Sequence, residues 1–272
     1  MHEKITLAGN LGSGKSTVAK ILTERLGMEY FSTGIICREV AAEHHMTVDE
    51  MNLQMETDFS LDREIDSRLP PLSDLPYSML IDSRMAWHFV RGSFRVYLTT
   101  EPAVSAARIF AAKRDTEQYQ TVEETERHNR GRQQSESKRY MQLYGVNNHD
   151  LNNYDLIVDT TYASPSEIAD CMESAFTAWL ADRSLRFCYL SPLRVYYPAT
   201  YEAGDVSPVL LSEQIEAGER PMVEICYDGE RFCVTGDPTV AIAYSLTSLP
   251  FIPCRLRTGN VSGEYVRMSD SL

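Results

Sequence analysis

The sequence predicts an α/β protein in which a parallel sheet flanked by helices spans residues 1–182 and a small α+β domain spans residues 187–272. Throughout the first part, short apolar runs alternate with segments of helical periodicity, which is typical of a parallel sheet covered on both faces. After residue 186 the pattern changes to short β-rich segments, with a strong hairpin signal at Asp228-Gly229. We therefore expect two domains of different architecture.

A glycine-rich stretch follows the first apolar run, which covers residues 4–8. It reads Gly9-Asn10-Leu11-Gly12-Ser13-Gly14-Lys15-Ser16-Thr17 and has the form G-x-x-x-x-G-K-S of a phosphate-binding P-loop. Glycines let consecutive N–H groups point at phosphate oxygens, the lysine places a charge on the β- and γ-phosphates, and the serine hydroxyl is offered to Mg²⁺. The residues expected to bind ATP here are Gly9, Asn10, Gly12, Ser13, Gly14, Lys15, Ser16 and Thr17.

A glycine-rich turn that binds nothing is the alternative interpretation of this stretch. The flanks disfavour it, because a strand must precede a P-loop and a helix must follow it. Residues 4–8 are apolar and partly β-branched, and apolar residues then recur at helical spacing up to a glycine stop at Gly27.

The other segments of the first part predict further elements. We expect strands at 28–32, 77–82, 94–98 and 154–159, and helices from residue 33, from residue 48, and over 59–69, 102–114 and 165–180. Thr47 and Ser164 each open a capping box. Three short helices thus separate the second strand from the third, and in a kinase such an excursion binds the phosphate acceptor.

Asp82 ends the third of these hydrophobic strands, which is a Walker B pattern. Behind a P-loop, this carboxylate is expected to hold Mg²⁺ through water, together with Ser16. A strand-end cap is the alternative role for Asp82. Arg84 lies two residues later, at the carboxyl edge of the sheet, where ligands bind in open α/β sheets.

A basic segment interrupts an acidic chain. Residues 127–139 hold five basic side chains and one acidic one, whereas the whole chain carries a net charge of −13. A solvated helical face is the ordinary explanation of a charge run. The alternative is a lid whose arginines close over two nucleotides, neutralise the transferring phosphoryl group and exclude water. Arg132, Glu136 and Arg139 would share one face of such a helix.

The composition limits the partners and the compartment. No apolar run reaches the length of about 18 residues that a membrane span needs, and the N-terminus shows no signal peptide. The six cysteines form no C-x-x-C pair and are expected to be reduced, so we expect a cytoplasmic protein. The acidic balance argues against nucleic acid and against an anionic membrane as partners. The oligomeric state stays open.

Taken together, residues 1–182 resemble the nucleoside monophosphate kinases, and within them the short form of the cytidylate kinases. Besides the P-loop, the resemblance is carried by Ser32-Thr33-Gly34 with Arg38, Ile81-Asp82-Ser83-Arg84, the run Arg132, Glu136 and Lys138-Arg139-Tyr140, Tyr144-Gly145, and 154–160. It implies a P-loop kinase that uses ATP and Mg²⁺ to convert CMP or dCMP into CDP or dCDP.

The resemblance also implies roles for individual residues. It makes Lys15, Arg84, Arg132 and Arg139 catalytic, with the last two bridging donor and acceptor phosphates. The residues that would bind the acceptor are Thr33, Arg38, Arg84, Glu136 and Arg139, of which Arg38 and Arg84 would hold its α-phosphate. Arg108 would lie against the adenine, and Ser16 and Asp82 would bind the metal.

The base preference stays open at this level. Where long family members have Gly-Arg-Asp, this chain has Ser83-Arg84-Met85, and Cys37 stands where they often have tyrosine. Between residues 52 and 70, four charged residues could face a base, although an amphipathic helix explains them equally well. These are Asp58, Asp62, Arg63 and Arg68.

The second part weakly resembles the ParB/sulfiredoxin-like fold, in the order of its strands, its Asp-Gly turn and the run Gly236-Asp237-Pro238-Thr239 before a helix. Families with that fold usually place His and Arg in this loop, and both are missing here. Residues 187–272 hold six basic and eleven acidic residues, which argues against DNA binding. We expect a regulatory, dimerising or stabilising role.

Two alternatives to a cytidylate kinase remain at this stage. One is a P-loop kinase that phosphorylates another small acceptor on the same scaffold. The other is a nucleotide-sensing protein without turnover, with residues 187–272 as its effector.

Overall fold

The computed structural model describes residues 2–112, 119–202, 206–259 and 261–270. The predicted strands of the first part are present, with bounds β1 Lys4–Gly9, β2 Glu29–Ser32, β3 Met79–Asp82, β4 Phe94–Thr99 and β5 Leu156–Asp159. The second part adds β6 Phe187–Leu190, β7 Val195–Pro198, β8 Val223–Tyr227, β9 Phe232–Val234, β10 Ile252–Arg257 and β11 Tyr265–Arg267.

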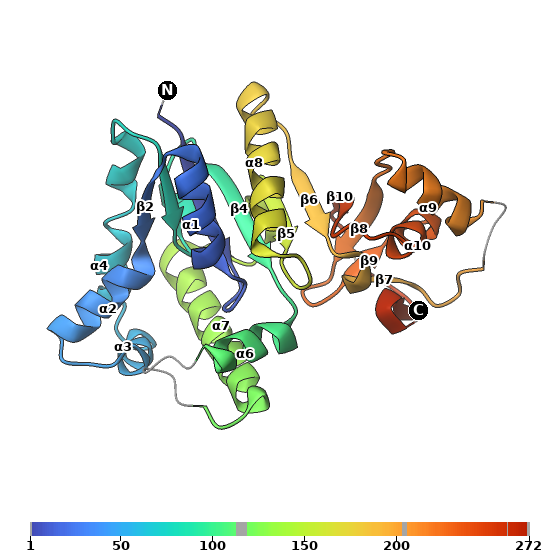
Figure 1. Cartoon of the computed structure of the whole chain (residues 1–272). Coiled ribbons are helices and arrows are strands. Elements are labelled where there is room, and N and C mark those ends of the chain that lie inside the picture. The colour runs from blue at the N-terminus through green and yellow to red at the C-terminus, as the bar shows by residue number, and fades with distance from the viewer. Residues whose placement is uncertain (1, 113–118, 203–205, 260, 271–272) are drawn as a thin grey trace.

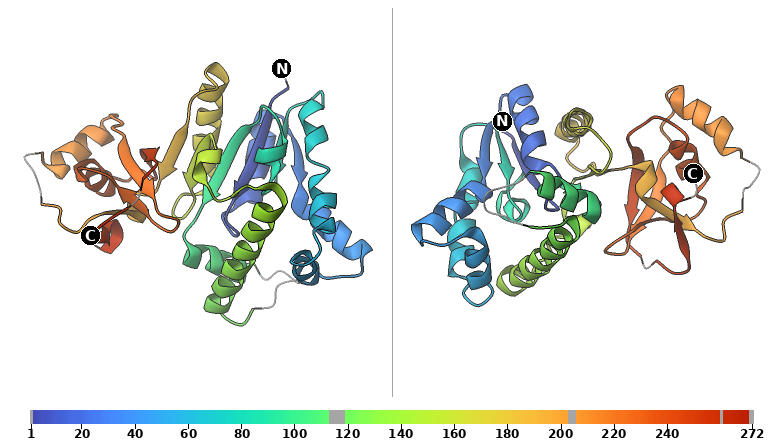
Figure 2. Two further views of the ribbon diagram at one scale, coloured as in Figure 1. Left: turned by 180° about the vertical axis from the view of Figure 1, so that it is seen from behind. Right: turned by 60° about the horizontal axis from the view of Figure 1, so that its bottom comes forward.

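All these strands belong to one continuous sheet, in the order β11-β7-β9-β8-β10-β6-β5-β4-β1-β3-β2 (Figure 1). From β2 to β6 every neighbouring pair is parallel. Beyond β6 the directions are mixed, because β6 and β10 run antiparallel and β10 and β8 run parallel. The two predicted domains therefore share a sheet through β6, and two lobes lie on either side of this strand (Figure 2).

Helices cover both faces of the parallel half. Their bounds are α1 Lys15–Leu26, α2 Thr33–Glu43, α3 Val48–Met55, α4 Ser60–Asp66, α5 Ala86–Phe89, α6 Pro102–Ala111, α7 Val122–Tyr144 and α8 Pro165–Ala181. Apolar residues of α1 and α8 pack on one face, against Leu7 of β1 and Val96 of β4. On the opposite face, Tyr140 of α7 packs with Ile81 of β3. Because both faces are covered, all residues of β1 are buried.

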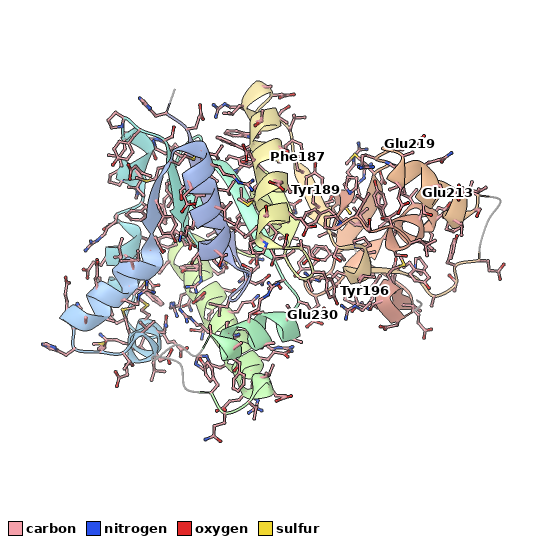
Figure 3. The ribbon with its side chains drawn as sticks, viewed as in Figure 1. Phe187, Tyr189, Tyr196, Glu213, Glu219 and Glu230 are labelled. Carbon is pink, nitrogen blue, oxygen red and sulfur yellow. The ribbon has the colours of Figure 1, made fainter. Side chains whose placement is uncertain are left out.

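The second lobe has a core that continues into the parallel half. Its helices are α9 Pro208–Glu216 and α10 Thr239–Ser245. Tyr97 of β4 and Ile157 of β5 belong to the same buried cluster as Phe232 and Tyr244 of the second lobe. At the junction, the rings of Phe187 and Tyr189 stack with centroids 6.4 Å apart on the side of α8 (Figure 3).

The predicted elements agree with the structure, apart from their ends. The capping boxes at Thr47 and Ser164 are present. The predicted hairpin is formed by β8 and β9, which are antiparallel. The helix predicted over 102–114 ends earlier, as α6, and residues 113–118 lie outside the described part. The sequence did not predict β7, α9 or β11. Within the described residues, no helix combines the length and apolar character that crossing a bilayer requires.

Candidate active site

The loop between β1 and α1 curls tightly around a buried polar centre. Gly9 has φ 146°, and a Cβ there would collide with the Leu98 carbonyl oxygen of β4. Gly12 has φ 70°, and its Cβ would lie 2.7 Å from the Ser105 carbonyl oxygen of α6. The Ser13 hydroxyl is buried and has no partner among the described residues. A loop of this shape, with an unsatisfied hydroxyl inside, suits an anion.

Lys15 lies at the start of α1 and folds back over this loop. Its Nζ donates to the carbonyl oxygens of Gly9, at 3.0 Å, and Asn10, at 2.8 Å. Burial lowers the pKa of Lys15 to about 8, although the neighbouring Asp82 carboxylate opposes the shift. The lysine is thus held at the phosphate loop, where a bound polyphosphate would favour its charged form.

Ser16 and Asp82 meet at the carboxyl ends of β1 and β3. The Ser16 Oγ donates to the Asp82 Oδ2 at 3.4 Å, and the Tyr30 hydroxyl donates to the same oxygen at 3.1 Å. Thr33 lies beside them and donates to the Asp82 carbonyl oxygen at 3.5 Å. This is an oxygen-only donor set next to a phosphate loop, and it fits Mg²⁺. The sequence analysis did not single out Tyr30.

Arg84 and Arg132 are joined by one buried carboxylate. Glu136 of α7 forms an ion pair with Arg84, whose Nε lies 2.9 Å from the Glu136 Oε2, and it accepts a hydrogen bond from the Arg132 Nε at 3.1 Å. Burial alone would raise the pKa of Glu136, but the guanidinium groups of Arg84, Arg132 and Arg139 outweigh it and hold the pKa below its usual range. Each guanidinium has five N–H donors, so the carboxylate occupies only part of each fork.

Arg139 is also buried on α7, and it faces a second carboxylate. Its Nε lies 3.1 Å from the Asp62 Oδ2 of α4, and its Nη1 donates to the Ser135 hydroxyl at 3.0 Å. Arg38 behaves differently, because its side chain is exposed on α2. Arg84, Arg132 and Arg139 line one cavity together, whereas Arg38 is not among the described residues that line it.

A cavity of about 460 Å³, open to solvent, lies between α2, α3 and α4 on one side and α7 on the other. Arg84, Arg132 and Arg139 line it together with Thr33 and Cys37. The polar residues Asn52, Asp62 and Asp66 also line it, together with apolar residues of α3 and α4 such as Met51 and Ile65.

Two polar groups of this lining lack the partners that would compensate for their burial. The Asn52 Nδ2 is buried without a partner among the described residues. Burial raises the pKa of Asp66 to about 7, even though the Tyr144 hydroxyl donates to its Oδ2 at 3.0 Å. Of the four charged residues left open by the sequence, Asp62 faces the cavity, and Asp58, Arg63 and Arg68 are exposed. Asp66 was missed, although it lies one helical turn after Asp62 on the same face.

Arg108 lies on α6 beside the loop that follows β5. Its Nη2 donates to the carbonyl oxygens of Thr160, at 2.7 Å, and Thr161, at 3.2 Å. A second, smaller cavity of about 310 Å³ lies between the phosphate loop and α7, and Arg84 and Glu136 line it as well. His149 also lines this cavity, and burial lowers its pKa to about 4. Sequence reasoning had not identified this histidine.

The comparisons with known proteins agree with this arrangement. Residues 4–162 match the model of the Cytidylate kinase-like family. A cytidylate kinase of Haloquadratum walsbyi is 36% identical over 177 residues, which are 64% of this chain and 90% of the relative. A cytidylate kinase of Sulfurisphaera tokodaii is 32% identical over 180 residues, which are 65% of this chain and 97% of the relative.

A solved structure shows the same fold at low sequence identity. It is that of an uncharacterized protein from Eubacterium ventriosum, with a TM-score of 0.50 and 13% identity, and the match covers 65% of this chain and 99% of that chain. Since the family model matches more than half of the residues, the chain belongs to the cytidylate kinase-like family of phosphotransferases.

Proposed function

We propose that this protein transfers the γ-phosphoryl group of MgATP to CMP or dCMP and releases ADP with CDP or dCDP. The observation that carries the proposal is the cavity beside the phosphate loop, which Arg84, Arg132 and Arg139 line together with the carboxylates of Asp62 and Asp66. A nucleoside monophosphate offers a group for each kind of side chain, because its phosphate is anionic and its base carries hydrogen-bond donors and acceptors.

The donor would be held by the loop after β1. Its backbone amides and Lys15 would bind the phosphates, and Arg108 with the Thr160–Thr161 backbone would flank the adenine. Ser16 and Asp82 would hold Mg²⁺, which would supply positive charge to neutralise the phosphates. The support is the position of Lys15 over the loop and the Ser16–Asp82 contact.

The acceptor phosphate would lie between Arg84, Arg132 and Arg139. Phosphoryl transfer requires two phosphates in line and their charge neutralised, with little covalent chemistry from the protein. Planar guanidinium groups can bind phosphate oxygens in a bidentate manner. We propose that Glu136 orients Arg84 and Arg132 for this task, because its carboxylate oxygens lie within 3.1 Å of the Nε of both guanidinium groups.

The base would lie against Asn52, Asp62 and Asp66. Cytosine presents an amine donor at N4 and acceptors at N3 and O2. Asp62 is already paired with Arg139, whereas Asp66 has an oxygen to offer to the N4 amine. The Asn52 Nδ2 can donate to a ring acceptor. Uracil carries a carbonyl oxygen in place of the N4 amine, so it lacks the donor that cytosine would offer to Asp66.

A coupled assay of ADP release tests this proposal directly, with CMP, dCMP, UMP, AMP and small hydroxylated metabolites as acceptors. We expect turnover of CMP and dCMP with the highest kcat/KM. Turnover of a small metabolite alone would show another small-acceptor kinase. Tight ATP binding without turnover, together with a partner captured through residues 187–272, would show a nucleotide sensor.

A further inference from the structure

The second lobe meets the first at the carboxyl ends of β4 and β5. It begins with β6, which pairs with β5, and continues into a short 3₁₀ turn, η3 Pro192–Arg194. The family model ends at residue 162, so this lobe is not part of the matched kinase segment. Figures 1 and 2 show β6 beside β5, at the junction with the second lobe.

Arg194 of η3 is inserted into the end of β5. Its Nη1 lies 3.0 Å from the Asp159 Oδ1, and it also donates to the hydroxyl groups of Thr99, at 3.3 Å, and Thr161, at 3.5 Å. Arg194 is 8% exposed and Asp159 is fully buried. The same Asp159 Oδ1 accepts from the Thr161 N–H at 3.0 Å and from its hydroxyl at 2.6 Å. Arg194 and Asp159 thus fix the conformation of the residues that follow β5.

A second arginine of this lobe forms an ion pair just after the end of β4. Arg267 of β11 forms a bidentate pair with Glu101, with contacts of 2.6 and 2.7 Å. The backbone N–H of Glu101 in turn donates to the Thr161 hydroxyl at 3.0 Å. Arg194 and Arg267 therefore both contact the same two connected segments, which are 99–101 and 160–161.

These two segments also form hydrogen bonds with residues of the proposed donor site. The Thr100 N–H donates to the Asn10 Oδ1 of the phosphate loop at 3.2 Å. The Thr160 and Thr161 carbonyl oxygens hold the Arg108 guanidinium. A shift of segment 160–161 would move the group that we propose to lie against the adenine, whereas the contact with the phosphate loop is made by Thr100 of the other segment.

We infer that Arg194 and Arg267 are positioning residues for the donor base: the second lobe holds the adenine side of the nucleotide site in its binding conformation. This inference rests on the proposed function, because that function makes ATP the donor. A buried ion pair is a weak source of net stability, but removing one partner leaves the other uncompensated. Without Arg194, the buried Asp159 carboxylate would lack its counter-charge, and its hydrogen bond with the Thr161 N–H would be weakened.

The test compares ATP with inorganic tripolyphosphate by isothermal titration calorimetry on the full chain. Tripolyphosphate engages the phosphate loop and has no base. We expect Arg194→Met to weaken ATP binding about tenfold, because Asp159 would be left buried without its partner. Binding of tripolyphosphate should stay within about twofold of the wild type. Arg194→Lys should restore part of the loss. Arg267→Met should weaken ATP binding about threefold, because its pair is partly exposed.

The matched control is Arg257→Met, which removes an ion pair with Glu224 elsewhere in the second lobe and should change neither affinity. Equal losses for ATP and tripolyphosphate, or no loss for either, would overturn the inference. If Arg194→Met does not fold, Arg267→Met and Glu101→Gln decide the question. Turnover of CMP by the wild-type protein decides the proposed function separately.

Discussion

The donor side and the acceptor side of the candidate active site are built in different ways. The proposed donor phosphates would face a single loop, residues 9–17, whose own backbone would form the site. The proposed acceptor cavity takes its walls from α2, α3, α4, α7 and the end of β3, so its residues are up to 107 positions apart in the sequence, from Thr33 to Tyr140. A local site depends on backbone conformation, whereas an assembled site depends on a buried network of charges.

The largest expected effect is on the donor side. Lys15→Met should lower kcat/KM by about 10³-fold, because it removes the charge placed on the transferring phosphate. Steady-state assays with saturating ATP measure the effect, and Lys20→Met, at an exposed position of the same helix, is the control. A change of less than tenfold at Lys15 would contradict the assignment.

On the acceptor side, Glu136→Gln should lower kcat about 10²-fold, because the Arg84 and Arg132 guanidinium groups lose the carboxylate that orients them. The apparent KM for ATP should change little. The matched control is Glu126→Gln, whose i,i+4 pair with Arg130 is exposed on the same helix. If both variants had the same kcat as the wild type, Glu136 would have no role in positioning.

Base selectivity should respond to Asp66. Asp66→Asn exchanges a carboxylate acceptor for an amide that can also donate, so the ratio of kcat/KM for CMP over UMP should fall about tenfold. Asp58→Asn, on the exposed side of this region, should leave the ratio unchanged. A ratio that does not respond to Asp66→Asn would place the base elsewhere.

The smallest expected effect is on the pH dependence of stability. The pKa of Asp66 is about 7 in the folded protein, against 3.8 as its ordinary value, so the folded state keeps a proton that the unfolded chain has released. Stability from this group therefore falls as pH rises from about 4 to about 7 and then stays constant. The thermal midpoint of the wild type should fall relative to that of Asp66→Asn by several degrees between pH 5 and 7. A constant difference across this range would contradict the shift.

Much of the fold was predictable, for reasons visible in particular residues. Gly27 and the capping boxes at Thr47 and Ser164 mark helix ends through local hydrogen bonds, and all three lie where they were predicted. In the second lobe, β7 and β11 have three or four residues each and were not predicted. β9 also has only three residues, but it was predicted from the Asp-Gly turn that joins it to β8, and no such turn marks β7 or β11. The pairing of β7 with both β9 and β11 identifies these two strands.

The residues of the candidate site were also predicted only in part. The P-loop residues were found by pattern, because their function needs one backbone conformation and that conformation needs those residue types. Asp66 and Asn52 were not found, because an acidic or amide side chain on a short helix has no sequence signal that separates a cavity wall from a solvated face.

The amino-acid sequence by itself determined the phosphate loop, the alternation of strands and helices, and the family to which the chain belongs. The first two depend on neighbours within about twenty residues, which a linear pattern records. The family is identified by a series of such short motifs along the chain. The tertiary structure alone decided which arginines meet Glu136, which carboxylates line the acceptor cavity, and that Arg194 enters the end of β5. Those choices depend on burial and on charge compensation between distant segments, and both exist only once the chain has folded.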